Sequence, residues 1–183
     1  LVNYSNGHLS NSPRRPHRAC LCRSHVLARA MSPIYDLPGH LTRRLQQIAV
    51  SAFTTELEKA GFDLTPVQFG AMCVLNEHPG IDQVTLAGLI AYDRVTIGGV
   101  ISRLEARGLI ERTVSESDRR ARVLRLSDRG AALLRTAWPA ARRAQDVMTA
   151  ALTAEERHDF MRLIGKVVDA NNELSRAPLR TMD

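Results

Sequence analysis

The chain has 183 residues, of which 44% are apolar and 24% are charged, a composition typical of one globular domain with room for an added arm. No apolar run approaches the ~20 residues that a membrane-spanning helix needs, so we expect no membrane partner. The three cysteines, two of them in residues 1–30, make no disulfide framework, so we expect a protein of the reducing cytoplasm. The formal net charge of +6 lies mostly at the start, because residues 1–30 carry five arginines and no acid. A nucleic-acid-binding surface must therefore be sought in local clusters of charge in the remaining sequence.

Residues 1–30 have no hydrophobic periodicity and are rich in Ser, Asn, Pro and Arg. This composition is typical of disorder, and it lacks the apolar core of a signal peptide. Since Met31 stands directly before the patterned sequence, we predict a disordered extension ahead of a natural start. Two alternatives stay open, a DNA-binding arm and a weakly indicated metal site. The metal site would use His17, Cys20, Cys22 and His25.

Two helices are predicted in the next part of the chain. Over residues 36–59, apolar positions recur every three or four residues, as in a helix with one buried stripe. Thr65, Pro66 and Gln68 then form a capping box with proline at the first helical position. This pattern predicts a second helix that runs to about residue 78.

A helix-turn-helix unit and a hairpin are predicted next. Apolar residues mark a short helix near residues 86–90, and the Tyr92-Asp93 pair indicates a turn before a helix over residues 95–107. Strands are predicted at residues 109–114 and 123–126, with the charged loop SESDRRAR between them. A helix-turn-helix followed by a hairpin is a winged helix.

Two long helices are predicted after the hairpin. The first begins at Ser127, runs to about residue 150 and contains Pro139, which we expect to kink it. A capping box at Thr153 opens the last helix, which runs to about residue 174. The predicted fold class is therefore mainly α with a small β-hairpin. The winged helix-turn-helix spans residues 64–127, and helical regions at 31–63 and 128–176 flank it.

A family resemblance is carried by RLEARGLIER (103–112) and SDRRARVLRLSDRG (117–130), which resemble the signature of the multiple-antibiotic-resistance regulator (MarR) family. The order of the elements across about residues 36–174 agrees with it. A narrower resemblance, to repressors of aromatic-acid catabolism and among them nicotinate-degradation regulators, is carried by YDLPGHLTRRLQQIAVSAF (35–53). The residues that match the family signature are Leu104, Glu105, Gly108, Leu109, Ile110, Arg112, Asp118, Arg120, Leu126, Ser127 and Gly130.

The resemblance implies a homodimeric bacterial transcription factor, usually a repressor, whose terminal helices interleave while each subunit offers one winged helix to double-stranded DNA. It also implies a small aromatic carboxylate or phenol as effector, bound between the dimerisation and DNA-binding parts. Apolar stripes without an internal partner agree with dimerisation through 31–63 and 128–176. Two-fold symmetry then predicts a pseudo-palindromic operator with half-sites ~10 bp apart. We therefore predict a repressor that an aromatic acid, nicotinate-related in the narrower resemblance, releases from this operator.

Candidate DNA contacts lie on the second helix of the helix-turn-helix and on the wing. Such a helix enters the major groove with its N-terminal residues foremost, and wing arginines suit phosphates or a narrow minor groove. The adjacent Gly98 and Gly99 predict close approach to DNA or to a neighbouring helix, or else a weak helix that packing rescues. The resemblance implies that Asp118 braces Arg120 within the wing. The candidates are Arg94, Thr96, Gly98, Gly99, Ser102, Arg103, Arg119, Arg120 and Arg122. A solvated charge run is the alternative for the wing.

An aromatic acid needs a cation or a strong donor for its carboxylate and apolar walls for its ring. The candidate effector contacts are His40, Arg44, Gln47, Phe69 and Cys73, with surface charge or core packing as the alternative for each. Redox sensing through Cys73 and a winged-helix protein-interaction module stay open as other functions. The sequence has no glycine-rich phosphate loop, H-E-x-x-H or nucleophile elbow, so we expect neither an enzyme nor a cofactor or metal.

Overall fold

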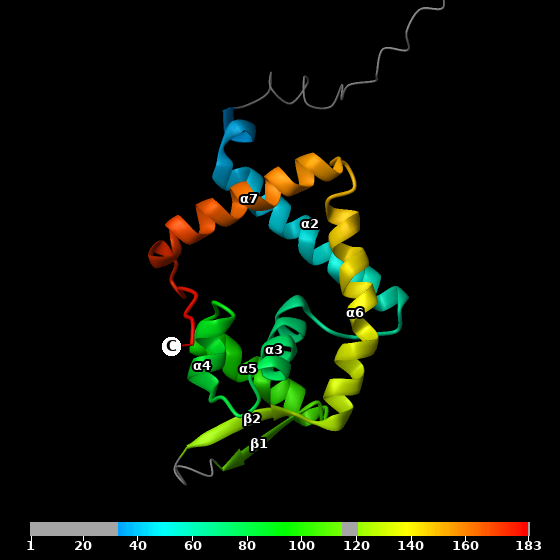
Figure 1. Cartoon of the computed structure of the whole chain (residues 1–183), viewed down its shortest axis with the longest axis vertical. Helices are drawn as coiled ribbons and strands as arrows, with labels where there is room; N and C mark the ends of the chain where they lie inside the picture. The colour runs from blue at the N-terminus through cyan, green and yellow to red at the C-terminus, as the bar shows by residue number, and fades with distance from the viewer. Residues whose placement is uncertain (1–32, 115–120, 183) are drawn as a thin grey trace, which may run out of the picture. The chain divides into compact units, whose positions relative to one another are not determined.

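A computed structural model describes residues 33–114 and 121–182 (Figure 1). The chain divides into two units, residues 1–43 and 44–183, which are described separately. In the first unit, η1 (Pro33–Asp36) precedes the first residues of α2 (Pro38–Lys59), and the Tyr35 and His40 rings meet edge to face with centroids 5.6 Å apart. The predicted disordered extension and its alternatives lie outside the described residues.

Three helices of the second unit form the helix-turn-helix: α3 (Pro66–Glu77), α4 (Gln83–Leu89) and α5 (Arg94–Ala106). The predicted capping box of α3 is confirmed, since Thr65 N donates to Gln68 Oε1 at 3.0 Å and Gln68 N donates to Thr65 Oγ1 at 3.3 Å. Both α4 and α5 begin at an aspartate N-cap. Asp93, interpreted from sequence as part of a turn, is the N-cap of α5.

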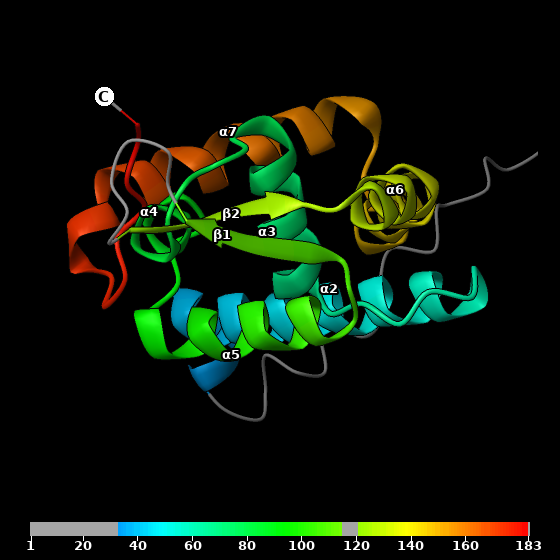
Figure 2. The same ribbon diagram turned by 90° about the horizontal axis from the view of Figure 1, so that it is seen from below.

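The predicted wing strands are β1 (Ile110–Val114) and β2 (Arg122–Leu126), which pair antiparallel with Ile110 opposite Leu126 (Figure 2). A bridge between Ile81 and Leu124 adds the segment before α4 to this sheet. Leu124 N donates to Ile81 O and Gly80 N donates to Leu124 O, both at 2.8 Å. The base of the wing is therefore bonded to the helix-turn-helix.

The buried core joins the end of α2 to α3, α4, α5, the hairpin and α6 (Asp128–Met148). Apolar burial of this kind is the main favourable contribution to folding. The helix α6 continues through Pro139, and the kink predicted there stays a prediction. The largest fully buried side chains are Leu57, Met72, Leu75, Leu86, Ile97, Ile101, Leu104, Leu109, Ile110 and Leu124.

The start of α6 is fixed against the end of α5. Ser127 caps the helix as predicted, and its Oγ also donates to Gly108 O at 2.7 Å. Gly130 lies so close to the residue before β1 that a Cβ atom there would overlap the carbonyl oxygen of Leu109. The glycine at position 130, which follows Leu126 and Ser127 in the family signature, therefore has a steric cause, because only glycine permits this approach.

The last helix, α7 (Ala154–Ala170), begins at the predicted Thr153 capping box and ends earlier than residue 174, where η2 (Asn172–Leu174) follows it. No residue of α7 is buried, although its sequence has an apolar stripe. Of the described helices, none alone is long and apolar enough to cross a membrane. Only α4 and α5 together meet that criterion, and they are bent by 110° at their junction.

Candidate nucleic-acid interface and pockets

The helix α5 has one buried face and one exposed face. Ile97, Val100, Ile101 and Leu104 are buried in the core. Of the α5 candidates, Gly98, Gly99, Ser102 and Arg103 turn away from these residues, whereas Arg94 lies three residues before Ile97, on the same side at the start of the helix. Within this set, Arg94, Thr96, Ser102 and Arg103 are exposed and Gly98 and Gly99 are half-buried.

The DNA-facing end predicted for α5 carries a carboxylate. Asp93 accepts hydrogen bonds from Thr96 N at 2.9 Å and from Thr96 Oγ1 at 2.7 Å. These bonds, followed by the nearby Arg176 guanidinium, hold the pKa of Asp93 below its ordinary value. Thr96 therefore organises the helix start, and the carboxylate that it stabilises is ionised at neutral pH.

The two glycines of α5 have different surroundings. A Cβ atom on Gly98 would lie 3.2 Å from Gln83 Nε2 of α4, whereas one on Gly99 would lie 3.3 Å from Arg103 Nη2 of α5 itself. The predicted close approach at Gly98 is therefore to a neighbouring helix. Gly98 O also accepts from Ser102 Oγ, and Gly99 O accepts from Arg103 Nε, each at 3.0 Å. Any contact of these side chains with DNA must share or replace these bonds.

The first turn of α5 exposes a side chain without polar atoms. Val95 lies in the first turn and is 87% exposed, which is unusual for a β-branched apolar residue. Its exposure is what distinguishes it from the core valines.

The wing is described only at its base. Arg122 is exposed in β2 opposite Val114, while Asp118, Arg119 and Arg120 lie outside the described residues. Arg125 is exposed on the same strand and lies over Gly80, where a Cβ atom would be 3.1 Å from Arg125 Nη2. The Arg125 side chain therefore packs over the turn that contains Gly80.

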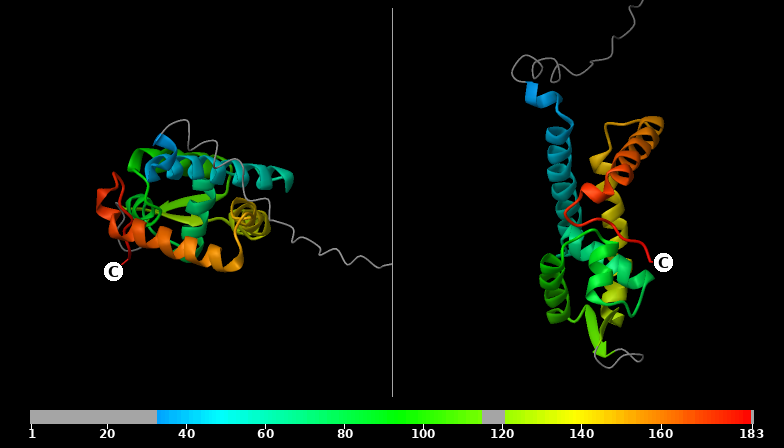
Figure 3. Two further views of the ribbon diagram at one scale, coloured as in Figure 1. Left: turned by 90° about the horizontal axis from the view of Figure 1, so that it is seen from above. Right: turned by 90° about the vertical axis from the view of Figure 1, so that its left-hand side faces the viewer.

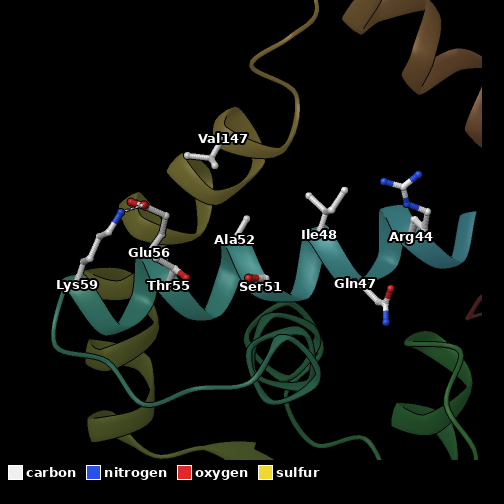
Figure 4. A pocket seen from close by; sticks show the side chains of 9 residues that line it. All are labelled: Arg44, Gln47, Ile48, Ser51, Ala52, Thr55, Glu56, Lys59 and Val147. Carbon is white, nitrogen blue, oxygen red and sulfur yellow. Dashed lines mark hydrogen bonds and ion pairs between the residues drawn. The ribbon is translucent and has the colours of Figure 1, made fainter. Parts of the chain in front are cut away.

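The predicted effector residues do not form one cluster. Arg44 and Gln47 line a pocket of about 530 Å³ along α2 that reaches Val147 at the end of α6. Figure 4 shows Arg44 and Ile48 pointing from α2 to the side on which α6 ends. His40 belongs to the first unit, where its Nε2 atom is buried and has no hydrogen-bond partner among the described residues.

An ion-pair cluster occupies the far end of this first pocket. Glu56 Oε1 accepts from Lys59 Nζ at 2.7 Å, and Glu56 Oε2 lies 3.5 Å from Arg143 Nε of α6. The side chain of Glu56 is only 11% exposed, and these cations, Lys59 foremost, lower its pKa. The cluster joins α2 to α6 and places a negative charge in the pocket.

Phe69 lies in a second pocket of about 330 Å³ between α2, α3 and α6. Its ring meets Phe53 edge to face at 5.5 Å and stacks with Trp138 at 5.4 Å between centroids. Arg142, one helical turn after Trp138, also lines this pocket. Sequence reasoning missed Trp138 and Arg142, although their i, i+4 spacing on α6 was a signal that both lie on one face.

Cys73 packs half-buried against the core. Burial, followed by the nearby Glu77 carboxylate, raises the pKa of its thiol to about 11. The reactive form of a cysteine is the thiolate, which is therefore scarce at neutral pH. This chemistry is opposite to what a redox-sensing cysteine needs.

Comparison with known proteins identifies the chain. The model of the MarR family matches residues 64–121, from α3 to the wing. The HTH-type transcriptional repressor NicR of Pseudomonas putida is 33% identical over 133 residues, which cover 73% of this chain and 83% of that relative. The chain belongs to the MarR family. The family resemblance seen in residues 103–130 is thus confirmed.

Two solved structures agree with this membership. PcaV of Streptomyces coelicolor, in complex with its natural ligand, is 35% identical with a TM-score of 0.69, covering 76% of this chain and 96% of that chain. BpsR of Bordetella bronchiseptica, whose DNA binding is regulated by 6-hydroxynicotinic acid, is 31% identical with a TM-score of 0.68, covering 73% and 94%. The narrower resemblance to regulators of aromatic-acid catabolism is therefore confirmed as well.

As a MarR-family member, the chain is a DNA-binding transcriptional regulator with a winged-helix fold. Its family and its relatives are regulators of transcription and not enzymes. The helix α5 is the second helix of the helix-turn-helix in this fold, and the hairpin β1–β2 is its wing.

Proposed function

We propose that this chain is a homodimeric repressor that a small aromatic carboxylate releases from a pseudo-palindromic operator. The observation that carries the proposal is the exposed face of α5, which is polar and basic and includes the capped N-terminus of the helix. The base of the wing is hydrogen-bonded to the same helix-turn-helix. The name of NicR as a repressor and the regulation of BpsR by 6-hydroxynicotinic acid support it.

In this proposal the first turns of α5 enter the major groove. Arg94 and Arg103 are exposed and suit guanine, which accepts two hydrogen bonds from one guanidinium. Val95 is exposed in the first turn and suits the methyl group of a thymine. Arg122 at the base of the wing, together with Arg119 and Arg120, binds phosphates, and Asp118 braces the wing arginines.

The dimer forms through the helical regions that flank the winged helix. Exposed apolar side chains on α7 lack an internal cover, and α2 adds Ile48 and Val50. Contiguous exposed apolar surface of this kind marks an interaction site. A second copy is the occupant we propose, because two recognition helices then meet two half-sites of one duplex. The exposed residues of α7 are Met161, Leu163, Val167 and Val168.

The effector site that the geometry favours is the pocket at Phe69. Phe69 and Trp138 offer two flat apolar walls, and Arg142 offers a cation for a carboxylate. Its volume of about 330 Å³ suits a single aromatic ring with small substituents. The pocket at Arg44 and Gln47 is the second candidate, and it already holds the Glu56 carboxylate, which repels an anionic ligand.

A thermal-shift experiment with a matched ligand pair tests the proposal. Nicotinate and 6-hydroxynicotinate should raise Tm and weaken binding to a duplex, whereas nicotinamide, which has the same ring without the charge, should do neither. Arg142→Ala should abolish the shift if the effector lies at Trp138, and Arg44→Ala should abolish it if the effector lies along α2. An aromatic acid that leaves both Tm and DNA affinity unchanged is not the effector, and failure of every benzoate and pyridine carboxylate contradicts the proposal.

A further inference from the structure

The residues after α7 form an ordered segment, residues 171–181, which we call the C-terminal strap. The strap turns back from α7 and lies beside α4 (Figures 1 and 3). One side chain closes the turn, because Asn172 Nδ2 donates to Leu179 O at 3.1 Å and Asn172 Oδ1 accepts from Leu179 N at 2.8 Å. Arg180 and Glu173 add an ion pair at 3.1 Å across the same turn.

The strap touches the helix-turn-helix through its main chain. Arg180 N donates to Gly88 O at 3.0 Å, at the end of α4. A Cβ atom on Gly88 would lie 3.1 Å from Arg180 Cβ and 3.2 Å from Arg180 Cγ, so the glycine permits a close approach. A single sequence position in α4 thus accommodates a segment more than 80 residues further along the chain.

A second contact reaches the recognition helix itself. Arg176 Nη2 lies 3.8 Å from Asp93 Oδ2, the carboxylate that caps α5. The side chain of Arg176 is 91% exposed and that of Asp93 is 35% exposed. The pair therefore lies at the surface where the DNA phosphates approach a recognition helix, and an uncompensated carboxylate there would repel them.

We propose that Arg176 is a positioning residue for DNA binding, which neutralises Asp93 from a strap docked on Gly88. This inference rests on the proposed function, since it requires α5 to enter the groove. The strap also joins α7, which carries the proposed dimer surface, to the turn before the recognition helix. An exposed ion pair is weak, so we expect about a two- to fivefold effect on DNA affinity.

A double-mutant cycle on Asp93 and Arg176 separates this role from a direct phosphate contact. The probe is a duplex selected from a randomised pool by the wild-type chain, and the dissociation constant is measured at two salt concentrations. Arg176→Ala should weaken binding about two- to fivefold in the wild type and should have no effect in an Asp93→Asn background. Arg176→Lys should retain wild-type affinity.

Arg162→Ala is the matched control, because Arg162 pairs with Asp159 within α7 at 3.0 Å and has no contact of this kind with α5. An Arg176→Ala variant that matches this control overturns the inference. Equal weakening in both Asp93 backgrounds, with a salt slope lower by about one, overturns it in favour of a direct phosphate contact.

A measurement without DNA tests the docking alone. Amide hydrogen exchange should be slowed at Arg180 in the full chain, because its N–H is bonded to Gly88 O. Exchange at the rate of an unstructured peptide overturns the docked strap. A wild-type chain that selects no duplex overturns the proposed function and the positioning role with it, while protection at Arg180 still shows that the strap is docked.

Discussion

Apolar side chains are largely buried in the winged helix but not in α7. From α3 to β2, apolar side chains such as Met72, Ile101 and Leu124 are buried within the same unit. In α7, apolar residues recur at helical spacing, yet none is buried. The first region lies in a core that it shares with the end of α2 and with α6, whereas α7 presents exposed apolar side chains, of the kind that marks an interaction site.

The two regions should therefore respond differently to substitution. Substitutions in the first region should change the free energy of unfolding at any protein concentration. Substitutions in the exposed stripe of α7 should instead change association, and their effects should depend on concentration.

Gly130→Ala should destabilise the first region most. A Cβ atom at this position would overlap the carbonyl oxygen of Leu109, so α6 must shift from the strand that it covers. We expect the free energy of unfolding in urea to fall by about 3 kcal/mol, as for an overpacked core. Gly70→Ala is the control, because a Cβ atom there meets nothing within 4 Å in α3, and it should stabilise the helix by up to about 1 kcal/mol. Equal stability of the two variants would contradict the close contact.

Val167→Glu should prevent dimerisation through α7 without unfolding the winged helix. Val167 is 63% exposed on the apolar stripe of α7, and a charge there must be desolvated when a second copy covers it. We expect a monomer by light scattering, an unchanged helical circular-dichroism signal and DNA binding weakened by about a hundredfold. Lys166→Glu places the same side chain on the other face of α7 and should leave a dimer. Dimers in both variants would remove α7 from the interface.

Val95→Ala should weaken DNA binding without lowering stability, because Val95 is 87% exposed in the winged helix. Since the methyl groups of Val95 make no core contact, stability should stay within about 0.5 kcal/mol of wild type. Affinity for the selected duplex should fall about fivefold, as expected for the loss of a contact to a thymine methyl group. Replacing each thymine by uracil should locate the contact. If no uracil position reproduces the loss, Val95 does not read a thymine.

Cys73 should show the smallest effect. Because burial raises its thiol pKa to about 11, the thiol is protonated at neutral pH and should react slowly with iodoacetamide and peroxide. In a chain with Cys20→Ser and Cys22→Ser, peroxide should leave DNA affinity unchanged. The raised folded-state pKa favours the folded protein below the unfolded thiol pKa, and this contribution should be lost as pH rises toward about 11. Rapid loss of DNA binding on oxidation would restore the redox alternative.

Local sequence signals predicted the elements well. The capping boxes at Thr65 and Thr153 and the cap at Ser127 all have the expected hydrogen bonds, because each depends on residues three positions apart. The hairpin and the order of the helices followed from periodicity in the same way. The domain boundaries near residues 63 and 127 stay predictions.

The candidate sites were harder to predict, because they depend on contacts between distant parts of the chain. The five effector candidates do not share one pocket. Arg44 and Gln47 line the pocket along α2, Phe69 lines the pocket between α2, α3 and α6, and His40 and Cys73 line neither of these two. Trp138 joins Phe69 across 69 positions, and no periodic signal records that contact. The strap was missed for the same reason, since an irregular segment docked by main-chain bonds has no side-chain pattern.

The bridge between Ile81 and Leu124 has a consequence for the shape of the operator. It joins the wing strand β2 to Ile81, two residues before α4, so the base of the wing is hydrogen-bonded to the helix-turn-helix. In the proposed complex, this connection sets the distance along DNA between the major groove under α5 and the flanking groove under the wing. A base pair inserted between those two footprints should therefore weaken binding far more than one inserted outside them, whatever its sequence.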